Sequence, residues 1–188
     1  MRVEFHKTGE RRYAVIVKRE DLPDLKMNPA PGFDPLMPHD LLHFLVEEEL
    51  GLRHGIFGQV ALGGTAGTFQ NQPSENSNSR TDSRLRRKTA RRGKKLLKEN
   101  TDDCAQSERA TYICLYDWLA HSSEEELRLR AKEMKVTFES ILGQMPENER
   151  KMLNKEKLAA IRNRMDESSK SWSALQVGQS MTLEWSLK

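Results

Sequence analysis

The chain has 188 residues, enough for one domain with an insertion, and 36% of its residues are hydrophobic while 31% are charged. Its longest clear apolar run, Tyr13–Val17, is far shorter than the ~18 residues of a membrane span, and the N-terminus lacks the apolar core of a signal peptide. The net charge of +3 conceals an asymmetry, because ten Lys or Arg but only one acid lie between Arg80 and Lys98. We therefore expect a cytoplasmic protein that does not cross a membrane and that carries a basic arm.

Both ends of the chain have the alternating pattern of β-strands. Residues 2–7 and 12–19 flank a turn at Thr8–Arg11, which predicts a hairpin. From Met181 to Leu187, every second residue is apolar, which predicts a third strand. Because a lone strand is not stable, we expect it to join the hairpin in a three-stranded antiparallel sheet made by both termini.

A stiff loop and a helix follow the hairpin. Residues 20–38 hold five of the seven prolines, which restrict the backbone and predict an extended loop. Pro38 suits the first turn of a helix, and Gly51 suits its C-terminal cap. The sequence therefore predicts a helix from His39 to Leu50.

The middle of the chain has the composition of an insertion. A short helix is expected over residues 56–62, in a glycine-rich stretch. Gln70–Ser83 is rich in Ser, Asn, Gln and Thr and nearly lacks apolar residues, so we expect a disordered linker. The basic arm follows, with a helix expected over residues 85–98 when a partner is bound. The prediction is a single domain over residues 1–188 in which residues 70–103 form a flexible linker and arm.

Three more helices are predicted in the C-terminal half. The first covers residues 107–121, and the second begins at a capping box formed by Ser122–Ser123 with Glu125 and Glu126 and ends at Gly143. The third follows a turn at Pro146. The second and third helices carry matching apolar stripes, which favours an antiparallel helical hairpin. The expected fold is α+β, with helices covering the sheet.

The helix at 39–50 holds the most informative side chains. His39 and His43 share one face because they are four residues apart, and Asp40 and Glu47 lie on its flank. Imidazoles and carboxylates are ligands for Zn²⁺ or Fe²⁺, so His39 and His43 are candidate metal ligands. Asp40 and Glu47 are candidates for a further ligand or a general base. The alternative is a polar helix flank with two ordinary histidines.

The segment His39-Asp-Leu-Leu-His43, followed by Gly55-Ile-Phe-Gly-Gln59-Val-Ala-Leu62, resembles a known zinc motif. It is the His-Asp-x-x-His motif of the ubiquinone-biosynthesis family called coenzyme Q protein four. The resemblance covers residues 39–62 and implies zinc at His39 and His43. Gln59 stands where that family has a Glu, after a longer spacer, and Glu47 is a substitute for that ligand. The chain as a whole is similar to an uncharacterised type of bacterial protein, a resemblance that implies no function.

The basic arm is the second candidate site. Its cations would neutralise phosphates without reading sequence, and no aromatic residue lies among them to stack on bases. The alternative is a solvated arm or one that folds against acidic helices. The candidate residues for nucleic-acid binding are Arg84, Arg86, Arg87, Lys88, Arg91, Arg92, Lys94 and Lys95.

Two functions remain open from the sequence. The first is a metal-binding protein, or a metal-dependent enzyme, with zinc or iron at the histidine helix. The second is a non-enzymatic adaptor that binds nucleic acid or an acidic protein through residues 80–98. The first is favoured because its residues converge on one helix face, whereas the arm is a signal of composition.

Overall fold

The computed structural model describes residues 1–20, 22–72, 79–99 and 101–187. Within these residues the fold is α+β, with seven helices and one antiparallel sheet of five strands in the order β4-β3-β2-β1-β5. The strands are β1 (Arg2–Gly9), β2 (Arg12–Lys18), β3 (Leu25–Ala30), β4 (Gln70–Asn71) and β5 (Ser180–Glu184). The helices are α1 (His39–Leu50), α2 (Ile56–Ala61), α3 (Ser79–Glu99), α4 (Thr101–Ala120), α5 (Glu125–Gln144), α6 (Glu147–Met152) and α7 (Lys155–Ser173).

The predicted three-stranded sheet of both termini is present as one side of the larger sheet, with β1 between β2 and β5 and with β5 at the edge. Val3 of β1 pairs with Val17 of β2 on one side and with Leu183 of β5 on the other. The two chain ends lie together, because the Trp185 N–H donates to the Met1 carbonyl at 2.8 Å. The expectation of three strands was wrong in number, since β3 and β4 extend the sheet beyond β2.

The two unexpected strands lie in segments whose composition predicted a loop and a disordered linker. β3 lies in the proline-rich segment that was expected to be a loop, and its Leu25 and Met27 point into the core. Its pairing with β2 is irregular between Tyr13 and Val15, which accommodates Pro29 in the strand. β4 has only two residues and occupies the start of the predicted linker.

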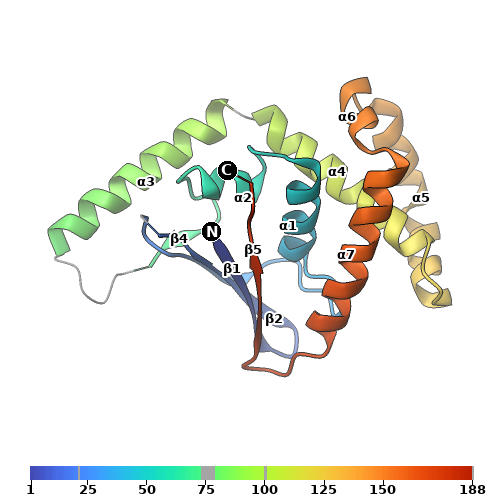
Figure 1. Ribbon diagram of the computed structural model, residues 1–188, viewed down its shortest axis with the longest axis horizontal. Coiled ribbons are helices and arrows are strands. Elements are labelled where there is room, and N and C mark those ends of the chain that lie inside the picture. The colour runs from blue at the N-terminus through green and yellow to red at the C-terminus, as the bar shows by residue number, and fades with distance from the viewer. Residues whose placement is uncertain (21, 73–78, 100, 188) are drawn as a thin grey trace.

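α1 is the central helix of the molecule. Pro38 is its N-cap, and Gly51 ends it in the left-handed conformation with φ of 71°, as the sequence predicts. Phe44 of α1 packs edge-on against Phe5 of the sheet at a centroid distance of 6.2 Å. Figure 1 shows α1 beside the sheet, with α4 and α7 on its other side.

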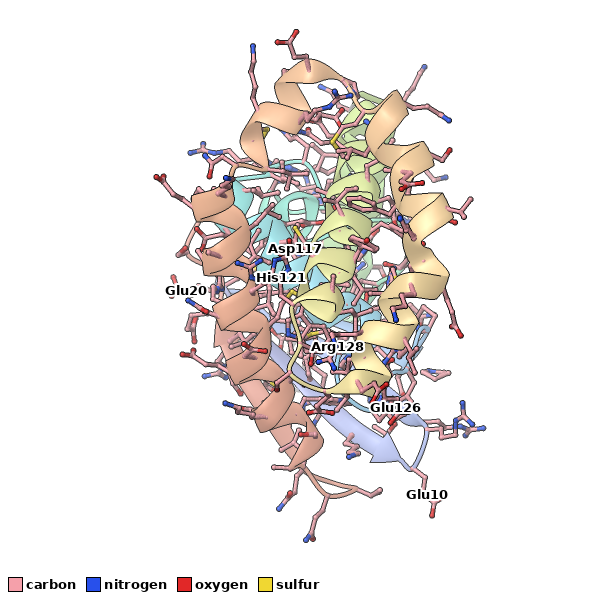
Figure 2. All side chains as sticks on the ribbon, turned by 90° about the vertical axis from the view of Figure 1, so that its right-hand side faces the viewer. Glu10, Glu20, Asp117, His121, Glu126 and Arg128 are labelled. Atoms are coloured by element: carbon pink, nitrogen blue, oxygen red, sulfur yellow. The ribbon has the colours of Figure 1, made fainter. Side chains whose placement is uncertain are left out.

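The structure corrects the pairing of the C-terminal helices. α5 packs against α4, whereas α7 packs against α1 and α4. Figure 2 shows α4 running between α5 and α7. α4 packs against both neighbours because its apolar residues lie on two sides of the helix. Tyr116 stacks on Phe138 of α5 with ring centroids 3.8 Å apart, while Leu119 is fully buried in the core.

Two further expectations need correction. α5 begins at Glu125, and among the described residues no side chain caps its first turn, so the predicted capping box is not formed. Instead, the Glu124 N–H donates to Ser122 Oγ at 3.1 Å, which makes a local turn before the helix.

α3 is longer than the expected helix at 85–98 and includes residues 79–83 of the predicted linker, while residues 73–78 of that linker lie outside the described part. Of the described helices, none is long and apolar enough to cross a membrane.

Candidate metal centre

The site forms where the first turns of α1 face α4. His39 and His43 lie one turn apart on α1, with ring centroids 4.5 Å apart. Glu108 of α4 lies opposite them, with its Oε2 at 3.5 Å from His43 Nε2 and 4.0 Å from His39 Nε2. One ligand atom from each of the three residues fits within 4.8 Å, so this group could hold a metal ion. The structure therefore joins the two predicted histidines to a carboxylate from a distant part of the chain.

The separations suit a transition metal. Two ligand atoms at the usual ~2.0–2.1 Å from a tetrahedral Zn²⁺ lie about 3.4 Å apart. The His43–Glu108 distance is already close to this value, and Glu108 can adjust because 60% of its side chain is exposed. Two imidazoles with one carboxylate form a ligand set for zinc or for non-haem iron.

His43 is oriented by side chains of α4. Ser107 Oγ donates to Glu47 Oε1 at 2.6 Å, so its lone pairs remain to accept from His43 Nδ1, which lies 3.0 Å away. Thr111 Oγ1 lies 3.3 Å from the same nitrogen. This network assigns the proton of a neutral ring to Nδ1 and leaves the lone pair on Nε2.

His43 Nε2 is buried and has no hydrogen-bond partner among the described residues. It faces Glu108 Oε2, and two lone pairs at 3.5 Å repel each other unless a positive species lies between them. Burial lowers the pKa of His43, but the carboxylates of Glu108 and Glu47 outweigh burial and raise the pKa to about 9. The interaction with His43 in turn lowers the pKa of Glu108. The site is therefore built for a cation, which is either a proton or a metal ion.

His39 is the more accessible imidazole, with 45% of its side chain exposed. Burial, followed by the charge of His43, lowers its pKa. A ring that stays neutral in neutral solution keeps a lone pair for a metal. The two histidines thus differ in role. His43 is buried and oriented by Ser107, whereas His39 is partly exposed and can reach a metal ion from solvent.

The structure does not bring Glu47 into this group. Its carboxylate is fully buried and accepts hydrogen bonds from the backbone N–H groups of Ile56 and Phe57 at 2.7 and 2.8 Å. It thereby satisfies the N-terminus of α2, which is an anion-binding position. Gly55 makes this possible, because a Cβ there would lie 2.4 Å from the carboxyl carbon. Glu47 Oε1 lies 3.5 Å from His43 Nδ1 and also accepts from Ser107, so it orients His43 from the side opposite the metal group, and this geometry does not support its predicted role as ligand or base.

Asp40 also has another partner. Tyr13 of β2 donates its hydroxyl hydrogen to Asp40 Oδ2, and the same hydroxyl lies 2.5 Å from the Pro31 carbonyl. Burial, reinforced by the charge of Asp40, raises the pKa of Tyr13 well above its ordinary range, so the hydroxyl keeps its proton. Burial also raises the pKa of Asp40. Asp40 links α1 to the sheet and does not face Glu108.

The remaining histidines lie apart from the group. His6 contacts Glu4 on the sheet at 3.1 Å, and His54 contacts Asp103 at 2.8 Å. Figure 2 shows His121 and Asp117 near the end of α4, where His121 Nδ1 lies 2.8 Å from the Asp117 carbonyl.

Gln59 is buried, and its amide donates to the His54 carbonyl at 2.9 Å. It stands where the resemblance places a ligand, but it does not belong to the group of His39, His43 and Glu108. The ligand set of this chain therefore differs from the one that the resemblance implies.

A cavity of about 240 Å³ adjoins the site at His39. Its wall is mostly apolar and includes one cation, Arg130, which is paired with Asp34 at 2.9 Å. The lining residues are Gly32, Phe33, Asp34, Met37, His39, Leu42, Leu115, Trp118 and Arg130. A small molecule in this cavity would contact His39 directly.

Sequence reasoning missed Glu108 and Ser107 because nothing in the chain near them signals a site. They are neighbours in an ordinary helical stretch, more than sixty positions from the histidines. Only the packing of α4 on α1 brings them together.

The described cations of the basic arm lie on α3. Those with a described side chain are exposed, namely Arg84, Arg87, Lys88, Arg91, Arg92, Lys94, Lys95 and Lys98, while the side chains of Arg80 and Arg86 lie outside the described part. They form a separate surface that does not contribute to the group on α1 and α4.

Comparison with known proteins identified no relative of this chain. No protein-family model matches the chain, and neither a curated protein nor a solved structure shows significant similarity to it. The function is therefore inferred from the geometry of the site.

Proposed function

We propose that the protein binds one divalent transition-metal ion, Zn²⁺ or Fe²⁺, through His39, His43 and Glu108, and that it is a metal-dependent enzyme. The observation that carries this proposal is the buried Nε2 of His43, which has no hydrogen-bond partner among the described residues and faces the Glu108 carboxylate at 3.5 Å. The resemblance of residues 39–62 to a zinc motif is consistent with the same two histidines.

Three protein ligands favour a catalytic site over a structural one. Structural zinc is usually closed by four protein ligands, whereas catalytic zinc and non-haem iron keep a position for water or substrate. Here two of the ligands are partly exposed, and His39 borders the cavity, so an open position would face a small molecule. A bound metal would supply Lewis-acid activation of water or of a substrate oxygen. The chain supplies the orientation of His43 through Ser107.

The test is metal analysis of the purified full-length protein and of single variants. After removal of metal with a chelator, the wild type is expected to take up about one Zn²⁺ or Fe²⁺ per chain. His39→Ala, His43→Ala and Glu108→Ala should each weaken uptake, and the double histidine variant should abolish it. His121→Ala and Glu133→Ala are matched controls outside the group and should bind like the wild type. A wild-type protein that takes up no Zn²⁺, Fe²⁺ or Mn²⁺ would reduce α1 to a structural helix.

A further inference from the structure

α3 is attached to the molecule along one side only. Thr89 and Gly93 are buried, and Leu96 is half-buried on the same side. A Cβ at Gly93 would lie 3.0 Å from Thr65 Oγ1 and 3.7 Å from Gly64 Cα, so the helix backbone packs closely on the loop after α2. This contact fixes the orientation of α3. Figure 1 shows the helix above β4 and α2, at the end of the molecule opposite α5 and α6.

The opposite side of α3 is uniformly positive. At about 100° per residue, the exposed cations cover an arc of roughly 160° whose centre points away from the packed side. They extend over roughly 21 Å of helix at a rise of ~1.5 Å per residue. We name this surface the cationic face; its members are Arg84, Arg87, Lys88, Arg91, Arg92, Lys94, Lys95 and Lys98.

Six members of the cationic face are not neutralised by the described part of the protein. Arg84, Arg87, Lys88, Arg91, Arg92 and Lys94 form no ion pair with a described residue. No acid lies between residues 83 and 98. Like charges four residues apart, such as Arg84 with Lys88 and Arg87 with Arg91, destabilise a helix. An anionic partner would remove this repulsion.

We propose that the cationic face binds the phosphate backbone of duplex DNA without reading its sequence. A straight helix with one exposed half fits the major groove of B-form DNA, which is about 12 Å wide, and its cations then reach the flanking phosphates. The corresponding groove of A-form RNA is too narrow for a helix. This function is independent of the metal centre.

Other partners fit the cationic face less well. Residues 79–99 contain no aromatic side chain on which the bases of a single strand would stack. Leu85 and Leu96, the leucines of α3 whose side chains are described, are half-buried on the packed side, so the described side chains of the exposed half include none of the large apolar residues that insert into a membrane. An acidic protein would also need an apolar centre in the interface, which a face made of cations does not offer.

The test measures binding of the full-length protein to a fluorescent 20-base-pair DNA duplex by anisotropy between 50 and 200 mM KCl. The wild type should bind at low salt, and its affinity should fall steeply as salt rises because bound cations are released. Gln is a good helix former and should replace four cations of the cationic face without unfolding α3, in the variant Arg84→Gln, Arg87→Gln, Lys88→Gln and Arg91→Gln. Affinity at 50 mM KCl should fall at least tenfold, and the slope of log K against log[salt] should shrink by about 3 to 4.

A matched control removes four exposed cations elsewhere, by Arg11→Gln, Arg12→Gln, Lys132→Gln and Lys155→Gln. It loses the same net charge and should retain most of the affinity for DNA. Circular dichroism and zinc uptake should be unchanged in both variants, which shows that the fold is intact. The proposal is overturned by absence of binding at 50 mM KCl, by salt-independent binding or by equal losses in the two variants. Tighter binding of single-stranded DNA, duplex RNA or polyglutamate than of the DNA duplex would overturn it as well.

Discussion

The hydroxyl of Ser107 determines which nitrogen of His43 is available. It donates to Glu47 and therefore accepts from Nδ1, which leaves Nε2 for a metal. Residues that orient a metal-binding histidine in this way typically contribute 10–100-fold to metal affinity. We expect Ser107→Ala to weaken zinc binding by about that factor, although Ser107 is not a ligand.

The measurement is a competition titration of zinc against a chromophoric chelator, with Ser168→Ala as the control. Ser168 is a buried serine of α7 outside the metal group, so its loss should leave zinc affinity unchanged. The tautomer of His43, followed through its ¹⁵N chemical shifts, should become mixed in Ser107→Ala only. Equal zinc affinities in the wild type and Ser107→Ala would show that Thr111 alone orients the ring.

His43 also predicts how the metal-free protein responds to pH. Glu108, Glu47 and His39 are the titratable groups that face it, and its folded-state pKa of about 9 lies above the ordinary 6.5. A raised pKa stabilises the fold fully below pH 6.5, and this contribution is lost as pH rises through 9. The free energy of unfolding, measured by urea denaturation, should fall over this window in the wild type. A His43→Gln variant should lack that part of the pH dependence.

The same proton competes with the metal. Apparent zinc affinity should rise about tenfold per pH unit between pH 6.5 and 8.5, because binding displaces one proton from His43. An ordinary imidazole would give this dependence only below about pH 6.5. The sequence identifies the imidazole, but the higher pH range of this dependence follows only from the packing of Glu108 and Glu47 around His43. A zinc affinity that is flat above pH 6.5 would contradict the raised pKa.

At the scale of elements, the sequence predicted those with a long periodic pattern. The hairpin, β5 and α1 have clear alternation or helical spacing, and their ends are marked by turn residues, Pro38 and Gly51. β3 was missed because its three core residues, Leu25, Met27 and Ala30, lie among prolines, and β4 was missed because two residues are too few to show a pattern. The partner of α5 was wrong because an apolar stripe shows that a helix packs but not on which neighbour.

The candidate site, too, could be predicted from the sequence only where its residues follow a local pattern. His39 and His43 were predictable because both lie on one helix at a spacing of four. Glu108 was not, since it joins them only through the packing of α4 on α1. The carboxylates predicted beside the histidines, Asp40 and Glu47, have instead been placed by the fold against Tyr13 and against the N-terminus of α2. Sequence spacing cannot show which partner a flanking carboxylate will find in three dimensions.

The start of α2 links the fold to the site. Gly55→Ala would place a methyl group against the Glu47 carboxylate, which must then leave the N–H groups of Ile56 and Phe57. Loss of hydrogen bonds to a buried charge typically costs about 1–3 kcal/mol, so we expect a decrease of that size in the free energy of unfolding. Zinc affinity should fall too, since Glu47 holds Ser107.

Gly143→Ala in α5 is the matched control for this change. A Cβ at Gly143 meets no atom within 4 Å, and Ala has the better helix propensity. Its free energy of unfolding should be unchanged or higher by up to about 1 kcal/mol. Urea denaturation at neutral pH measures both variants. A Gly55→Ala protein as stable as the wild type would show that Glu47 can move without loss.

At the scale of the whole molecule, the two halves of the chain are interleaved. The first half supplies β1 to β4 and α1, while the second supplies β5, which pairs with β1, and the helices α4 and α7, which pack on α1. The metal ligands are divided in the same way, with His39 and His43 in the first half and Glu108 in the second. Neither half alone has the three ligands, so metal binding reports on the assembly of the two.

A chain cut between the halves should therefore remain one particle with one metal site. A recognition sequence for a specific protease, inserted between Ser74 and Glu75, would lie in the polar segment that contains no core-forming residues. After cleavage of the folded protein, the two fragments should co-elute in size-exclusion chromatography and retain zinc uptake close to that of the uncut protein. In 6 M urea they should separate and release the metal, because the β1–β5 pairing and the contacts of α1 with α4 and α7 are then lost. If the fragments separate without denaturant, the sheet and helices do not form the single interleaved core described above. If the fragments stay together but lose zinc, the assembled group of His39, His43 and Glu108 is not sufficient to bind the ion.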